Sequence, residues 1–165
     1  MKVVVAAAAI ALLAGCASQP QTKDAAAPVS SAAGTAASKP VPQKTTDLWL
    51  AKGRLGAAEP AVYFDYDKFN IKPQFHGTVS AFGNYLALDD KARIVIEGNA
   101  DERGTVEYNL ALGQKRAEAV SIGLQAIGAN PARVEAISNG EEKPRNKAKT
   151  EAAFAENRRA DLILK

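Results

Sequence analysis

Asp101 and Arg116 are the two residues whose types and spacing suggest a binding site most directly. Asp101 follows an apolar stretch that is typical of a buried strand, and Arg116 lies two turns into the helix expected after it. A guanidinium grips a carboxylate through two parallel hydrogen bonds, whereas a carboxylate accepts hydrogen bonds from an ammonium. The pair could therefore hold a zwitterionic amino-acid group by both of its charges. The alternative is that the two side chains form an ion pair with each other on a solvated face.

The elements that would position this pair are a strand, a polar loop and a helix. Residues 92–97 are short and apolar enough to form a central strand, and Asn109 is a suitable N-cap for a helix over residues 110–127. Helical side chains lean toward the helix N-terminus, so Arg116 can reach back to the loop. The predicted core positions of this helix are Leu110, Gly113, Ala117, Val120, Leu124 and Ile127.

The remaining patterns predict an α+β domain over residues 61–165. Residues 61–66 alternate as a strand does, with Val62, Phe64 and Tyr66 on one face. A helical stripe follows, formed by Phe75, Val79, Phe82 and Leu86. A strand over 133–138, a short helix near 150–156 and a closing strand over 159–165 complete the order β-α-β-α-β-(α)-β. We expect the two main helices to pack on one face of a mixed sheet.

Composition excludes several classes of function. The chain has 165 residues and a net charge of +3, with basic residues spread along it, so nucleic acid is not an expected partner. One cysteine rules out an internal disulfide, and one histidine argues against a histidine-built metal site. Asp65, Asp67 and Glu102 could form a glycosidase pair or a hard-metal site, but a strand-end turn and a pocket wall explain them better. We therefore expect no enzyme activity, cofactor or metal.

Residues 1–15 have the basic start and short apolar run of a secretory signal, too short to span a bilayer. The ending Leu13-Ala14-Gly15-Cys16 resembles the bacterial lipobox, in which the cysteine is lipidated and becomes the first mature residue. An ordinary signal peptide with a chance cysteine is the alternative. Residues 16–60 are then the lipidated Cys16 and a flexible tether, because their composition is too polar to form a core. Within the tether, we expect residues 48–50 to pack on the domain edge, and contact with a partner is the alternative.

Several separate motifs resemble the OmpA-like C-terminal domain family across residues 61–165. They are residues 62–68, 96–105, 107–109, 112–113, 116–117, 119–120, 140–144 and 157–160. Two of them, residues 62–68 and 140–144, together with the lipobox, narrow the resemblance to the peptidoglycan-associated lipoproteins. Such proteins bind the meso-diaminopimelate of peptidoglycan stem peptides without a covalent bond.

The resemblance implies a role for each site residue. Asp101 would take the ammonium of diaminopimelate and Arg116 its carboxylate. The other implied peptidoglycan-binding residues are Leu112, Arg103, Thr105, Asn99, Ala100, Tyr66 and Asp67. Many family members have histidine where this chain has Asn99, so a pH-dependent contact would be absent here.

The resemblance also implies a cellular setting. The protein would be anchored by lipid in the outer membrane with its domain in the periplasm, and it would join the cell wall to that membrane as part of the Tol-Pal system. The alternative function is docking of the propeller protein TolB, and possibly of other Tol proteins, with wall binding secondary. A third hypothesis, a cell-wall hydrolase, has no catalytic set to support it.

Overall fold

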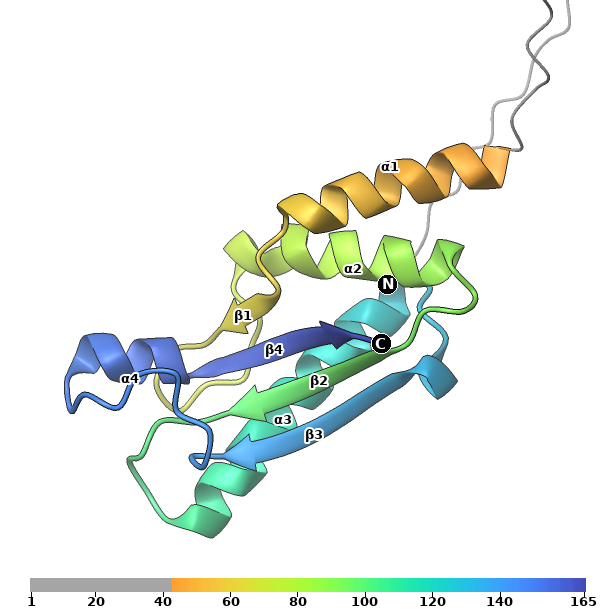
Figure 1. Ribbon diagram of the computed structural model, residues 1–165. Coiled ribbons are helices and arrows are strands. Elements are labelled where there is room, and N and C mark those ends of the chain that lie inside the picture. Colours follow the sequence, from red (N-terminus) through yellow and green to blue (C-terminus); the bar gives the residue numbers. More distant parts are fainter. Residues whose placement is uncertain (1–42) are drawn as a thin grey trace, which may run out of the picture. The chain divides into compact units, whose positions relative to one another are not determined.

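The computed structural model describes residues 43–165, apart from the side chains of residues 43, 45 and 46. Its helices and strands alternate in the predicted order, with one additional helix at the start (Figure 1). They are α1 (Gln43–Ala57), β1 (Ala61–Tyr63), α2 (His76–Leu88), β2 (Ile94–Asn99), α3 (Val106–Ile127), β3 (Val134–Gly140), α4 (Glu151–Asn157) and β4 (Arg159–Leu164). Single 3-10 turns at Pro73–Phe75 and Pro131–Arg133 precede α2 and β3.

The four strands form one mixed sheet in the order β1-β4-β2-β3. β2 runs parallel to β3, whereas β4 runs antiparallel to both β1 and β2. The expected α+β fold is therefore confirmed. β1 is shorter than predicted, because the strand ends at Tyr63 and the chain turns away. Phe64 is still buried, but Tyr66 is exposed and does not share the inner face with Val62.

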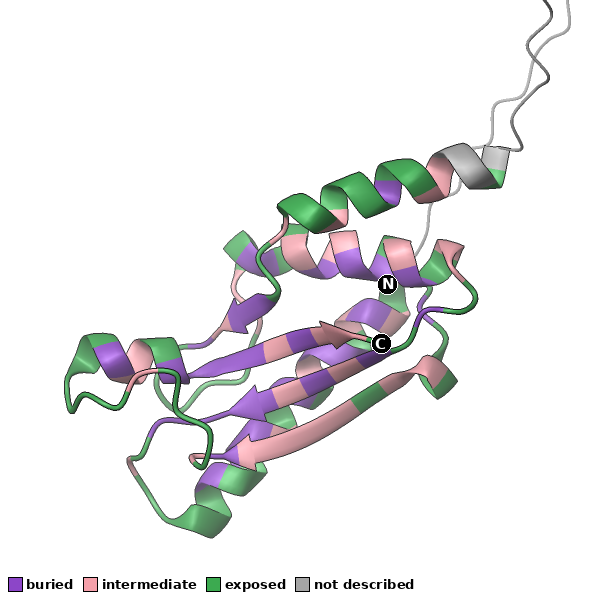
Figure 2. Cartoon of the chain, in the orientation of Figure 1, coloured by how far each residue is buried: buried purple, intermediate pink, exposed green. Residues whose placement is uncertain are grey.

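The core lies between the sheet and the two helices α2 and α3, where buried residues concentrate (Figure 2). All four residues of the predicted α2 stripe are buried. On α3, Ala117, Val120 and Leu124 are also buried as predicted, but Leu110 is half exposed. Leu112 is the buried leucine of the first turns instead, on the face that lines the cavity described below.

The start of α3 is the clearest local correction. Thr105 has extended backbone angles, and its side-chain oxygen accepts a hydrogen bond from the backbone N–H of Tyr108. Thr105 is therefore the N-cap, and Asn109 is a buried residue inside the first turn. Glu107 lies in that turn, where the helix dipole favours an acid. The helix ends as predicted at Gly128, whose positive φ of 118° suits glycine.

Two glycines let α3 lie directly on β2. A Cβ atom built on Gly98 would be 1.9 Å from the carbonyl oxygen of Gly113, and one on Gly113 would be 2.3 Å from Ser138 Oγ. No larger residue fits at either position without moving the backbone. Asp101 lies just beyond Gly98, and Arg116 lies one turn beyond Gly113. This contact thus sets the distance between the two residues of the proposed pair.

Helix α1 occupies residues that we expected to be part of the tether over 16–60. It lies along α2, burying Ala51 and bringing Leu55 against the core (Figure 1). The expectation that residues 48–50 pack on the domain edge is wrong for Trp49, which is 76% exposed, whereas Leu50 is half exposed and lines a groove with residues of α2. The signal segment and Cys16 lie outside the described residues. Within residues 43–165, no helix combines the length and apolar character needed to cross a bilayer.

Candidate binding site

One cavity of about 140 Å³ contains both charges of the proposed pair. Its walls come from the loop after β1, the loop between β2 and α3, and the first three turns of α3. The lining residues are Tyr66, Asp67, Asp101, Arg103, Gly104, Tyr108, Asn109, Leu112 and Arg116. No hydrogen bond or ion pair joins Asp101 to Arg116, although both are fully described. The alternative of a direct ion pair is therefore wrong.

Arg116 is completely buried and is held by backbone carbonyl oxygens. Its Nε donates to Lys68 O at 2.9 Å, Nη1 to Asn99 O at 2.8 Å and Nη2 to Asp65 O at 3.2 Å. An arginine has five N–H groups, so two remain for a ligand. Burial lowers the pKa of Arg116 to about 10, with the charge of Asp101 acting in the opposite direction. The guanidinium is still protonated at neutral pH, and no carboxylate of residues 43–165 forms an ion pair with it.

Asp101 is only 4% exposed and is paired with two other arginines. Arg103 donates from Nη2 to Oδ2 at 2.6 Å and from Nε to Oδ1 at 3.2 Å, and Arg158 Nη1 lies 3.2 Å from Oδ2. Burial alone would raise the pKa of Asp101. The hydrogen bonds from the side chain and backbone of Arg103 and from Arg158 outweigh burial, so this pKa lies below its usual value. Asp101 is thus a stable carboxylate whose partner a ligand ammonium would have to displace or share.

Arg103 has partners that could keep it in place after such a displacement. Its guanidinium lies 4.1 Å from the ring centre of Tyr66 and 4.7 Å from that of Phe154, and Nη1 is 3.1 Å from Glu151 Oε2. Cation–π contacts of this kind are worth about 0.5–1 kcal/mol at exposed sites. About a third of the Arg103 side chain is exposed, in contrast to Arg116 and Arg158. Of the two arginines paired with Asp101, Arg103 is therefore the one that a ligand can reach from solvent.

Asp67 and Tyr108 form the outer wall of the cavity. Asp67 has a φ of +53°, the left-handed region that non-glycine residues seldom adopt. Its carboxylate accepts a hydrogen bond from the Tyr108 hydroxyl, and this bond is the main reason why the pKa of Tyr108 is raised. The contact ties the loop after β1 to the first turn of α3. Strained residues of this kind cluster at functional sites.

Six of the predicted site residues line the cavity: Tyr66, Asp67, Asp101, Arg103, Leu112 and Arg116. The other three do not. Thr105 is used as the N-cap of α3, and Ala100 lines a neighbouring cavity. Asn99 contributes its backbone carbonyl to Arg116, but its side chain points away from the cavity.

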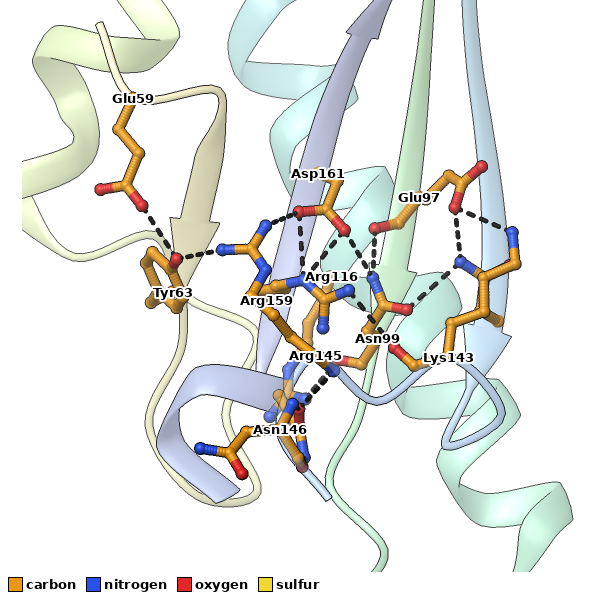
Figure 3. A network of polar contacts seen from close by, with 12 residues as sticks. Glu59, Tyr63, Glu97, Asn99, Arg116, Lys143, Arg145, Asn146, Arg159 and Asp161 are labelled. Carbon is orange, nitrogen blue, oxygen red and sulfur yellow. Dashed lines mark hydrogen bonds and ion pairs between the residues drawn. The ribbon is translucent and has the colours of Figure 1, made fainter. Parts of the chain in front are cut away.

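The Asn99 side chain joins a polar network at the ends of β2 and β4 (Figure 3). Its Nδ2 donates to Glu97 O at 2.9 Å and to Asp161 Oδ2 at 3.3 Å. Asp161 also receives Arg145 Nη2 at 2.7 Å and Arg159 Nε at 2.9 Å. This network fixes the end of β2, from which the loop carrying Asp101 begins.

Sequence reasoning missed four residues of the candidate site: Gly104, Tyr108 and Asn109, which line the cavity, and Arg158, which pairs with Asp101. Tyr108 shares a helical face with Leu112 and Arg116 at four-residue spacing, a signal that is visible once the helix is started at Val106. Arg158 gave no such signal, because it approaches Asp101 from the far end of the chain. Of Arg158 and Arg159, the first is a buried partner of Asp101 and the second begins β4. Among residues 43–165, no group of three or more histidine, cysteine or acidic residues could hold a metal ion.

The sequence matches the profile of the OmpA family over residues 63–158. The peptidoglycan-associated lipoprotein of Pasteurella multocida is 46% identical over 101 residues, which are 61% of this chain and 67% of that protein. That of Brucella melitensis is 37% identical over 144 residues, covering 80% of this chain and 84% of the relative. The matched part thus spans about two thirds of the first relative and more of the second.

Solved structures agree with these sequence matches. The crystal structure of the peptidoglycan-associated lipoprotein from Burkholderia pseudomallei has a TM-score of 0.64 at 47% identity, covering 65% of this chain and 91% of that one. The C-terminal domain of Helicobacter pylori MotB has a TM-score of 0.60 at 16% identity, which is evidence for a shared fold alone. The chain therefore belongs to the OmpA family and, within it, to the peptidoglycan-associated lipoproteins.

Proposed function

We propose that this protein binds peptidoglycan without a covalent bond, through the diaminopimelate of the stem peptide, and that it has no enzyme activity. One observation carries the proposal. Asp101 and Arg116 line the same small cavity but are not paired with each other. Each is fixed by other groups, Arg116 by carbonyl oxygens and Asp101 by arginines. Opposite charges held apart in one cavity match the ammonium and carboxylate of a single amino-acid centre.

The ligand carboxylate binds the two N–H groups that Arg116 has left. The three carbonyl contacts hold this guanidinium in position before the ligand arrives, which reduces the entropy lost on binding. The ligand ammonium binds Asp101 and displaces the Arg103 guanidinium toward Glu151, which it already contacts. The buried Arg158 stays with Asp101 throughout. Leu112 and the ring of Tyr66 cover the aliphatic part of the ligand.

The lipid anchor completes the proposed function. Cys16 is acylated and holds the protein in the outer membrane, and the domain reaches the wall from the periplasmic side. The lipobox-like ending of residues 13–16 and the printed names of the lipoprotein relatives support this. One acyl chain anchors a protein only marginally, whereas several hold it almost permanently.

The test compares a muropeptide containing meso-diaminopimelate with the same peptide containing lysine, which lacks the second carboxylate. We expect titration calorimetry to show binding of the first and a loss of about 2–5 kcal/mol for the second, the cost of removing one partner of a buried charged contact. Arg116→Lys keeps the charge but loses the paired hydrogen bonds, and Asp101→Asn keeps the shape but loses the charge. Asp90→Asn removes an exposed acid that pairs with Lys44, so it is the matched control.

Both site variants should weaken binding of the diaminopimelate peptide, while Asp90→Asn should not. Circular dichroism and thermal melting of each variant check that the domain is folded. Unchanged affinity in folded Asp101→Asn and Arg116→Lys would contradict the assignment of the site. Equal affinity for the lysine and diaminopimelate peptides would contradict the assignment of the ligand.

Docking of TolB is a second candidate function, and the rim of the cavity favours it. Two aromatic side chains that line the cavity, Tyr66 and Tyr108, are also largely exposed. Exposed aromatic side chains are enriched at protein interfaces. If TolB and the wall peptide use this same face, the peptide should release bound TolB in a competition assay. Simultaneous binding of both would show that TolB uses another surface or none.

A further inference from the structure

The outer face of α1 carries residues that neither the core nor the candidate binding site uses. Trp49 is largely exposed, although tryptophan is highly buried on average in folded proteins, and Leu50 beside it is half exposed. Gly53 and Gly56 follow on the same side of the helix as Trp49, at four- and seven-residue spacing. A Cβ atom on either glycine would meet nothing within 4 Å. Glycine destabilises a helix relative to alanine, so packing inside the domain does not explain these two residues.

The charge of this face is positive. Lys52 and Arg54 are exposed, and within residues 43–165 neither has a hydrogen bond or an ion pair. Lys44 is also exposed, but it pairs with Asp90. Among the side chains of α1 that the structure describes, none that is exposed is acidic, because Asp47 is half-buried. An exposed tryptophan beside basic residues without partners is typical of helices that lie at a membrane surface.

The place of α1 in the chain fits such a surface. It is the first described element after the proposed anchor, since Gln43 follows Cys16 by 43 minus 16, or 27, positions. A chain of this length spans at most about 90–97 Å, which limits the distance between α1 and the membrane. Figure 1 shows α1 at one end of the domain and the loop between β2 and α3, which carries Asp101, at the other. A surface that contacts the outer face of α1 therefore leaves the cavity open on the far side.

We infer that the outer face of α1 is a docking surface for an anionic phospholipid membrane. The ring of Trp49 enters the headgroup layer, Lys52 and Arg54 bind lipid phosphates, and the two glycines let the membrane approach the helix backbone. So few contacts bind weakly by themselves, but the covalent link to Cys16 raises the effective concentration of α1 at the membrane. The inference rests on the lipid anchor of the proposed function. It adds an orientation to that function, with the cavity facing away from the membrane.

The test uses the single cysteine and the single tryptophan of the chain. The chain from Cys16 onward is coupled through its thiol to a maleimide-bearing phospholipid, so the test does not depend on acylation in the cell. The vesicles contain phosphatidylcholine with or without phosphatidylglycerol. We expect the Trp49 emission to shift to shorter wavelength only on the anionic vesicles, and the shift to disappear at high salt because ions screen the charges. The same emission on both kinds of vesicle would overturn the inference.

A double variant, Lys52→Gln with Arg54→Gln, tests the charge of the surface. Each basic residue near an anionic membrane contributes about fivefold to binding, so the ratio of docked to free α1 should fall about 25-fold. Lys147→Gln with Lys149→Gln is the matched control, because it removes two exposed lysines from the loop after β3 and leaves α1 unchanged. The control should keep the emission shift. An equal loss in both double variants would show a general effect of net charge and would refute this docking surface.

A second reporter tests the orientation. In a variant with Trp49→Phe and Val106→Trp, the only tryptophan lies in the first turn of α3, at the cavity end of the domain and at an exposed position. Lipids with a quencher in the headgroup should quench Trp49 in the parent protein but not the new tryptophan, and equal quenching would overturn the orientation. Titration of the same chain with the diaminopimelate peptide separates the two proposals. Peptide binding without docking refutes this inference alone, whereas docking without peptide binding refutes the assignment of the cavity and supports the docking surface.

Discussion

Replacing Gly98 by alanine should damage the stability of the domain and its binding site together. The added Cβ would stand 1.9 Å from the carbonyl oxygen of Gly113, whereas real Cβ atoms essentially never come closer than 3.0 Å to a neighbour. The difference, 3.0 minus 1.9, is 1.1 Å. Both atoms belong to backbone, one in β2 and one in α3, so no side chain can rotate away. The helix must move from the sheet by about this distance.

The loss of stability follows from the packing between α3 and β2 that this movement disturbs. Inserting a methyl group into a well-packed core costs about 1–3 kcal/mol, and more where the backbone is the obstacle. This domain lies between the size classes for which each kcal/mol lowers the melting temperature by about 4–8 °C and by about 2–4 °C, so a shift of about 4 °C per kcal/mol is expected. The same shift separates Arg116 on α3 from the Asn99 carbonyl and from Asp101, both fixed by β2. A binding site tolerates only about 0.5 Å of displacement, so affinity for the diaminopimelate peptide should fall at least tenfold.

Thermal melting and calorimetric titration measure both effects on the same sample. Gly77→Ala is the matched control, because a Cβ at Gly77 in α2 meets nothing within 4 Å. Alanine is favoured over glycine in a helix by about 0.5–1 kcal/mol, so this variant should be as stable as the parent protein or more so. If Gly98→Ala melts at the parent temperature, or binds as well as the parent, the close contact does not set the site.

Two further predictions concern the start of α3 and the acid of the site. Thr105→Ala should lower the free energy of unfolding, measured in urea, by about 1 kcal/mol because the N-cap hydrogen bond is lost. Thr105→Ser keeps a hydroxyl and should retain most of this stability. An equal loss of stability in both variants would exclude a capping role. The folded pKa of Asp101 is below its unfolded value of about 3.9, so its stabilising effect is complete above pH 4 and disappears as the pH falls through the folded pKa. The stability difference between the parent and Asp101→Asn should therefore be large at pH 7 and shrink below pH 4, and a difference independent of pH would contradict this.

The order of strands and helices could be predicted because each follows a hydrophobic period. The stripe of Phe75, Val79, Phe82 and Leu86 fixes both α2 and the face that it buries. The start of α3 was misjudged because two polar residues compete for the role of N-cap. Asn109 is intrinsically as good a cap as Thr105, but Thr105 caps the helix, and the Asn109 side chain is buried and donates to Glu141 instead.

The partners of Asp101 could not have been predicted from local pattern. Arg158 reaches it across 57 positions of sequence, and its approach depends on β4 lying beside both β1 and β2. Helix α1 was missed for a different reason. Its sequence contains few apolar residues, and Ala51 is its one residue that the structure shows as buried, supported by Leu55 against the core and by the Lys44–Asp90 ion pair. Contacts of this kind leave almost no periodic signal.

The way in which each charge is neutralised explains why the pair forms a site rather than an ion pair. Arg116 donates hydrogen bonds to carbonyl oxygens from the loop after β1 and from β2, but these neutral groups do not balance its positive charge. Burial accordingly lowers the pKa of Arg116 to about 10. Asp101, in contrast, is fully paired, and one of its partners, Arg103, is partly exposed. A ligand carboxylate therefore relieves a charge that the fold leaves unmatched, whereas a ligand ammonium only exchanges with a cation already present. Most of the binding free energy should come from the carboxylate at Arg116, with Asp101 setting orientation and selecting against ligands that carry no ammonium.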